Sequence, residues 1–196
     1  MITIEKIQYL QYRISRFEDQ QAYKELFTSF HTYLCQFART FVKAKEPAEE
    51  IVSDVFIKIW EKRKGLEKID NLKLYLYVAT RNTAFNYLDK QKRNATHSTE
   101  DLPATLTSVY LDPEQLLITA DMLALIQKAI DLLPTQCRLI FKLVKEDGLK
   151  YREVAEILDI SAKTVENQLA IALHKIGTAV NFDIRRTISS QMRHHP

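Results

Sequence analysis

A row of polar side chains recurs at helical spacing in SAKTVENQLAIALHKI, near the end of the chain. Lys, Thr, Asn and Glu side chains carry the hydrogen-bond donors and acceptors that read base edges in the DNA major groove. A small alanine in the same row would let the helix backbone approach that surface closely. The row predicts a DNA-reading face; the alternative is the solvated side of an ordinary helical hairpin. Its members are Lys163, Thr164, Glu166, Asn167, Ala170 and His174.

Two short helices are expected to position this row. Apolar spacing predicts a helix over 151–158, a turn over 159–161 and a second helix from Ala162 to about Ile176. Ser161 is a favourable N-cap for the second helix. Short helices paired in this way are typical of the helix-turn-helix motif, whose second helix enters the major groove. The core side of the second helix is predicted to carry Val165, Leu169, Ala172, Leu173 and Ile176.

A second set of polar groups lies in the predicted helix NLKLYLYVATRNTAFNYLDKQKR. One face is apolar, with Leu72, Leu76, Ala79 and Thr83, while basic and amide groups gather towards the other end. Cations neutralise phosphates and aromatic rings stack on unpaired bases, so the mixture suits single-stranded nucleic acid as well as an ordinary amphipathic helix. The polar set is Arg81, Asn82, Asn86, Lys90, Lys92 and Arg93, and the interleaved rings are Tyr75, Tyr77, Phe85 and Tyr87.

An acidic surface is predicted on the helix PAEEIVSDVFIKIWEKR. Two adjacent apolar rows form a stripe that is broad enough for one core: Ile51, Val55, Ile59 and Val52, Phe56, Trp60. The residues outside that stripe are Glu50, Ser53, Asp54, Ile57 and Glu61. Their surface is either a solvated face or a docking site for a partner.

The segment between these two parts of the chain is acidic. No Lys or Arg occurs from Asn94 to Gln127, whereas the acids there are Glu100, Asp101, Asp112, Glu114 and Asp121. The segment is rich in Thr and Ser and is broken by Pro103 and Pro113. It is typical of a linker, and a plain solvated tether would explain its composition.

Composition favours an all-α protein and argues against an enzyme. The 196 residues include three glycines and five prolines, which leaves few tight turns. No Gly-rich phosphate loop or nucleophile elbow is present, and the five histidines do not group with carboxylates. Cys35 and Cys137 lack metal-ligand spacing. We therefore expect no cofactor, metal or small-molecule substrate.

The sequence also contains neither a long apolar span nor a signal peptide. We therefore expect a cytoplasmic protein without membrane insertion.

Taken together, these blocks resemble the extracytoplasmic-function group of bacterial RNA polymerase sigma factors. The resemblance rests on AEEIVSDVFIKIWEK, LYLYVATRNTAFNYLDKQKR and LPTQCRLIFKLVKEDGLKYREVAEILDISAKTVENQLAIALHKI, in the family's order. SAKTVENQL is most similar to the Bacteroides-like forms. The resemblance implies two small helical domains: a sigma region 2 domain over 1–93 and a sigma region 4 domain with the helix-turn-helix over 121–196. A flexible acidic linker over 94–120 would join them.

The resemblance also implies partners. Core RNA polymerase would be bound through its largest-subunit clamp helices by Glu50, Ser53, Asp54 and Ile57. Promoter DNA would be bound at its minus-10 element by Arg81, Asn82, Asn86, Lys90 and Arg93, beside a base-capturing loop over 64–74. The minus-35 element would be read by Lys163, Thr164, Glu166, Asn167, Ala170 and His174. The resemblance suggests an anti-sigma factor as a further partner.

A different class of regulator shares part of this pattern. ISAKTVENQL is close to the C-terminal domain of LuxR-type helix-turn-helix transcriptional regulators. A response regulator of that class would need strands alternating with helices in its N-terminal half, and nothing before residue 93 alternates in that way. The sequence therefore favours the sigma factor over a LuxR-type regulator.

Overall fold

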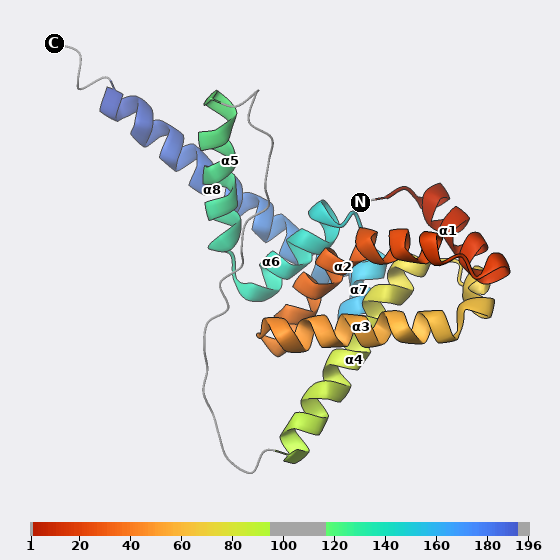
Figure 1. Cartoon of the computed structure of the whole chain (residues 1–196). Coiled ribbons are helices and arrows are strands. Elements are labelled where there is room, and N and C mark those ends of the chain that lie inside the picture. Colours follow the sequence, from red (N-terminus) through yellow and green to blue (C-terminus); the bar gives the residue numbers. More distant parts are fainter. Residues whose placement is uncertain (1, 95–116, 192–196) are drawn as a thin grey trace. The chain divides into compact units, whose positions relative to one another are not determined.

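The computed structural model describes the backbone of residues 2–94 and 117–191, and the side chains of 2–93 and 123–179 (Figure 1). The described residues form helices and no strands. This confirms the all-α fold and contradicts a receiver domain of alternating strands and helices over 2–94. The chain divides into two compact units, Met1–Leu106 and Thr107–Pro196. Most of the expected acidic linker lies outside the described residues.

The first unit is built from four helices and a short 3₁₀ helix. In chain order they are α1 (Ile4–Phe17), α2 (Gln20–Val42), α3 (Lys45–Glu61), η1 (Arg63–Lys68) and α4 (Leu72–Asn94). Helix α3 packs on both α2 and α4, while α1 packs on α2 and η1. The expected stripe of α3 is buried, apart from the half-buried Trp60. Large side chains from three helices, including Phe30, Phe56 and Tyr77, fill the core.

Helix α1 is an element that the sequence analysis did not predict. Its apolar residues Ile7, Leu10 and Ile14 are all buried, and their spacing of three and four is the signal that could have revealed the helix. Thr3 caps its first turn by accepting a hydrogen bond from the Lys6 backbone N–H at 3.3 Å. Asp19 then caps α2 through two backbone N–H groups, so the chain turns sharply between the two helices.

The second unit contains α5 (Leu117–Asp131), α6 (Thr135–Phe141), a π-helical turn η2 (Lys142–Glu146), α7 (Tyr151–Leu158) and α8 (Ala162–Gln191). Helices α5, α6 and α7 all pack on α8. The helix predicted over 151–158 is confirmed, as is the start of the next helix at Ala162. However, α8 continues well beyond Ile176, and α5 begins inside the range 94–120 assigned to the linker.

One predicted core position of α8 is wrong. Val165, Leu169 and Ala172 are buried as expected, and Ile176 is half-buried. Leu173 instead leaves 47% of its side chain exposed. A helical wheel places it near the apolar face, but the neighbouring helices cover only the narrower row around Ala172. The width of the buried face is thus set by the partners of the helix.

Gly148 ends the π-helical turn with a φ of 63°, in the left-handed region. Replacing Gly148 with Ala should lower the free energy of unfolding of this unit by about 1 kcal/mol, because a Cβ is strained there. The matched change Gly177→Ala should instead raise it by roughly 0.5–1 kcal/mol, since Gly177 lies inside α8 and nothing lies within 4 Å of an added Cβ.

Urea denaturation of the full chain followed by circular dichroism would measure both changes. The fluorescence of Trp60, the one tryptophan of the chain, reports separately on the first unit. Equal stability of the two variants would contradict the role given to the left-handed backbone at Gly148.

Candidate functional site

The polar row of α8 lies on an exposed face of the helix. Lys163, Glu166, Asn167, Ala170 and His174 are exposed. The opposite face is held by the buried Val165, Leu169 and Ala172 against the other helices of this unit. A rigid helix therefore presents the row, and one turn of it contains an amide, a cation and a carboxylate. That combination can donate to and accept from base edges.

Local hydrogen bonds organise the first turn of this row. The Ser161 hydroxyl accepts from the Thr164 backbone N–H at 3.0 Å and lies 2.8 Å from the Thr164 hydroxyl. Thr164, which is half-buried, therefore takes part in the N-cap. Lys163 Nζ lies 2.8 Å from Glu166 Oε2. Such an exposed ion pair contributes at most about 1 kcal/mol. Either side chain can therefore exchange its partner for a ligand at little cost.

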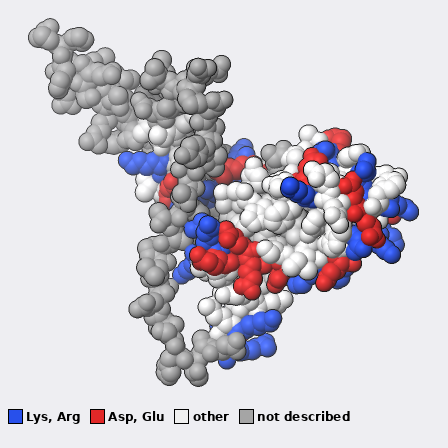
Figure 2. Space-filling view, in the orientation of Figure 1, with Lys and Arg blue, Asp and Glu red and all other residues white. Residues whose placement is uncertain are grey.

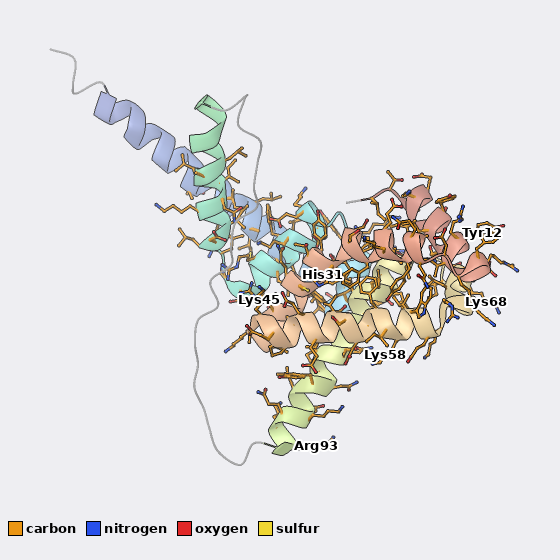
Figure 3. The ribbon with its side chains drawn as sticks, viewed as in Figure 1. Tyr12, His31, Lys45, Lys58, Lys68 and Arg93 are labelled. Atoms are coloured by element: carbon orange, nitrogen blue, oxygen red, sulfur yellow. The ribbon has the colours of Figure 1, made fainter. Side chains whose placement is uncertain are left out.

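A cleft of about 610 Å³ lies between α3 and α4. Glu50 and Asp54 of α3 line it, together with Asn86, Lys90 and Arg93 of α4. Figure 3 labels Arg93 at the far end of α4 and Lys58 along α3, and Lys58 is a further cation of this lining. Residues that the sequence assigned to two separate sites thus share one cleft. The α3 wall carries two acids and Lys58, and the α4 wall carries amides and cations together with Asp89.

The remaining residues of those two sets lie outside the lining. Ser53 and Ile57 are exposed on α3, and the Ser53 hydroxyl donates to the Glu49 carbonyl at 2.8 Å. On α4, the Arg81 guanidinium donates to Asn82 Oδ1 and lies over the Phe85 ring at 6.0 Å. The structure therefore divides the α4 set into two groups, one beside Phe85 and one in the cleft.

The aromatic residues of α4 do not act as one stacking row. Tyr77 is fully buried and packs on Phe37 with ring centroids 5.1 Å apart, so it belongs to the core. Tyr75 and Phe85 are exposed, and the half-buried Tyr87 lines the cleft. Beyond these rings, Lys and Arg side chains gather at the end of α4 (Figure 2), where Lys90, Lys92 and Arg93 are exposed. This end can bind phosphates.

The segment that joins α3 to α4 borders a second cleft, of about 390 Å³. Glu67, Ile69 and Asp70 line one side of it, and Gln8, Gln11 and Tyr12 of α1 line the other. The sequence analysis expected the loop over 64–74 to be functional but did not include α1. That cleft could not be found from sequence because its two walls are at least 55 residues apart in the chain, from Tyr12 to Glu67.

The cysteines provide no reactive site. Cys35 Sγ lies 3.6 Å from His31 Nε2, which is the pair of groups that a thiol nucleophile needs. Burial, with a smaller effect of the Glu49 charge, raises the pKa of Cys35 to about 11, opposite to the activation such a nucleophile requires. Burial also raises the pKa of Cys137. Among the described side chains, no three His, Cys, Asp or Glu residues are grouped for a metal ion.

No helix within the described ranges is long and apolar enough to cross a membrane.

Comparison with family models identifies both units. Residues 26–94 match the model for Sigma-70 region 2, and residues 123–176 match Sigma-70, region 4. The first match covers α3, η1, α4 and most of α2; the second covers the helix-turn-helix.

Curated relatives match along nearly the whole chain. The RNA polymerase sigma factor NccH of Alcaligenes xylosoxydans xylosoxydans is 30% identical over 163 residues, covering 81% of this chain and 86% of that protein. The ECF RNA polymerase sigma-E factor of Escherichia coli K12 is 26% identical over 175 residues, covering 86% and 91%.

Solved structures share the fold. The sigma factor RpoE of Bartonella quintana, in complex with the anti-sigma factor NepR, superposes with a TM-score of 0.54 at 24% identity, covering 82% of this chain and 97% of that one. CnrH in complex with the cytosolic domain of CnrY gives a TM-score of 0.50 at 19% identity, covering 91% and 99%.

Proposed function

Because the chain belongs to the extracytoplasmic-function group of RNA polymerase sigma factors, we propose that α3 and α4 bind core polymerase and the minus-10 element while α8 reads the minus-35 element. A sigma factor is an initiation factor and not an enzyme. The observation that carries the assignment of surfaces is the α3–α4 cleft, where Glu50 and Asp54 of α3 lie opposite the amides and cations of α4. The domains we propose are region 2 over 1–93 and region 4 over 121–196, joined by the linker over 94–120.

The α3 side of the cleft is the proposed docking surface for the clamp helices of the largest polymerase subunit. Glu50 and Asp54 project from a helix whose opposite stripe is buried, so their position is rigid. A partner with basic side chains would satisfy both carboxylates. The exposed Ser53 and Ile57 flank these acids and extend the surface. Charge complementarity of this kind mainly sets partner choice and association rate.

The α4 side is the proposed surface for the minus-10 element. Lys90 and Arg93, with Lys92 beside them, would neutralise phosphates, and Asn86 would bond a base edge. Arg81 and Asn82 lie closer to the start of the helix, beside the exposed Phe85 ring, which could stack on an unpaired base. Once the acids of the cleft are paired with polymerase, the cations of the same cleft are left for DNA.

Three finer features belong to the same proposal. SAKTVENQL supports the Bacteroides-like form of the group. An anti-sigma factor is proposed as a partner because the structure of similar fold from Bartonella quintana is a complex with the anti-sigma factor NepR. A cytoplasmic location is proposed because that is where core polymerase and promoters are found.

Reversing the charge of Asp54 tests the docking surface. Asp54→Lys should weaken binding to core polymerase roughly tenfold or more without loss of helicity, because a partner's cation would then meet a like charge. Pull-down and titration with core enzyme would measure it. The control Glu146→Lys makes the same change of net charge at an exposed residue of the second unit. Unchanged binding by folded Asp54→Lys would remove α3 from the interface.

Removing the three cations at the end of α4 tests the phosphate contacts. Changing Lys90, Lys92 and Arg93 to Ala should weaken promoter binding across sequences and reduce the slope of log K against log salt by about 2–3. Fluorescence anisotropy of holoenzyme with promoter DNA at several salt concentrations would show this. A control triple change of exposed lysines, Lys24 on α2, Lys45 on α3 and Lys62 in the turn after α3, should leave the slope intact.

Changing Asn167 tests base reading by α8. Asn167→Ala should alter the preferred minus-35 sequence and cost about 1–3 kcal/mol at the affected position, since an amide can bond adenine through two atoms. Selection from promoters with a randomised minus-35 element would reveal the preference. Gln136→Ala, an exposed amide on α6, is the matched control. The same selected motif from Asn167→Ala and wild type would show that Asn167 reads no base.

A further inference from the structure

Gln11 of α1 is a buried polar residue that binds a distant part of the chain. Its side chain is 4% exposed, and its Nε2 donates to the Leu66 carbonyl at 3.0 Å and to the Ile69 carbonyl at 2.9 Å. The amide of one side chain thus donates two hydrogen bonds, one to a carbonyl in the last turn of η1 and one to the carbonyl of the residue that follows η1. Helix α1 precedes the residues that match sigma region 2, so this contact comes from outside the matched part of the chain.

The Gln11 amide supplements the few hydrogen bonds available to these two carbonyls. They lie at the end of a 3₁₀ helix, where backbone carbonyls lack partners within the helix. The Leu66 carbonyl also accepts from the Ile69 N–H at 3.1 Å. Gln11 adds a donor to it and supplies one to the Ile69 carbonyl. An amide from another helix therefore caps the C-terminal end of η1.

A second hydrogen bond holds the other end of η1. The Ser15 hydroxyl, one turn further along α1, donates to the Lys64 carbonyl at 3.0 Å. Two ion pairs also join these regions, Arg16–Glu67 at 2.8 Å and Arg63–Glu18 at 2.9 Å, but both are partly exposed and contribute little. Besides the buried Leu66 side chain and the segment's own backbone hydrogen bonds, Gln11 and Ser15 are therefore the buried polar contacts that hold the segment on α1.

These contacts shape the cleft between α1 and the joining segment. Gln11 lines the cleft, and Glu67, Ile69 and Asp70 form the wall that its hydrogen bonds hold in place. Tyr12 of α1 and Lys68 of η1 lie at this end of the unit (Figure 3). A shift of the Leu66–Ile69 backbone would move that wall directly.

We propose that Gln11, assisted by Ser15, is a positioning residue that holds the 64–70 segment in the conformation required for selecting the minus-10 base. The inference rests on the proposed function, together with the base-capturing role that the family resemblance implies for the loop over 64–74. Gln11 acts through the backbone carbonyls it binds. Loss of its donors therefore reduces base discrimination while docking on polymerase through α3 persists.

The test compares Gln11→Leu, which removes both donors at similar volume, with wild type and with Gln20→Leu, the same change at an exposed position. Ser15→Ala is a milder second variant. Full-length proteins are reconstituted with core polymerase and bound to non-template single strands from a promoter mapped among transcripts induced by overexpression. The discrimination ratio is the affinity for the natural minus-10 sequence divided by the affinity for a single-base substitution. The affinity for core polymerase and the midpoint of urea unfolding are measured for each variant as well.

We expect Gln11→Leu to lower the discrimination ratio about five- to tenfold and Ser15→Ala about twofold, with core affinity within about twofold of wild type. Full discrimination by folded Gln11→Leu, or a parallel loss of discrimination and core affinity, would overturn the positioning role. If Gln11→Leu does not fold, unchanged discrimination by Ser15→Ala overturns it. A wild-type protein that discriminates at no minus-10 position would instead contradict the proposed function, and the inference with it.

Discussion

Burial of the apolar stripe of α3 against α2 and α4 is the constraint on which the first domain depends. Ile51, Val55 and Phe56 are almost fully removed from water, and each such side chain contributes roughly 1.5–3 kcal/mol. The orientation of α3 about its own axis is therefore set by its core. Glu50 and Asp54 must then face outward, and α4 must cross beside them with Asn86 and Lys90 on the opposite wall. Core packing and the cleft are consequences of one arrangement.

In the second domain, a narrower buried row sets the orientation of α8. Three helices pack on α8, and among its described side chains, 162–179, only Val165, Leu169 and Ala172 are fully covered. Most of the polar row is exposed, which leaves room for a partner there. The Ser161 cap and the left-handed Gly148 fix where these short helices begin and end. A small domain can in this way present a rigid helix to DNA.

Polar contacts have a different role from the apolar core. Surface ion pairs such as Lys163–Glu166 are weak, so they leave the interaction surfaces adaptable. The buried amide of Gln11 is specific, because a donor without partners in that position would lose its hydration with no compensation. Apolar burial thus supplies stability, while a few buried hydrogen bonds hold the backbone of the segment that joins α3 to α4.

The sequence by itself determined the helices α3, α4 and α7, the start and cap of α8, and the exposure of most of its polar row, because helical periodicity and capping are local properties. Only the tertiary structure decided that Tyr77 is core, that Leu173 is exposed, and that Asp54 and Lys90 share a cleft. It also decided that Gln11 holds a segment far along the chain. These features depend on which elements pack together, and the spacing of residues within one helix does not specify its neighbours.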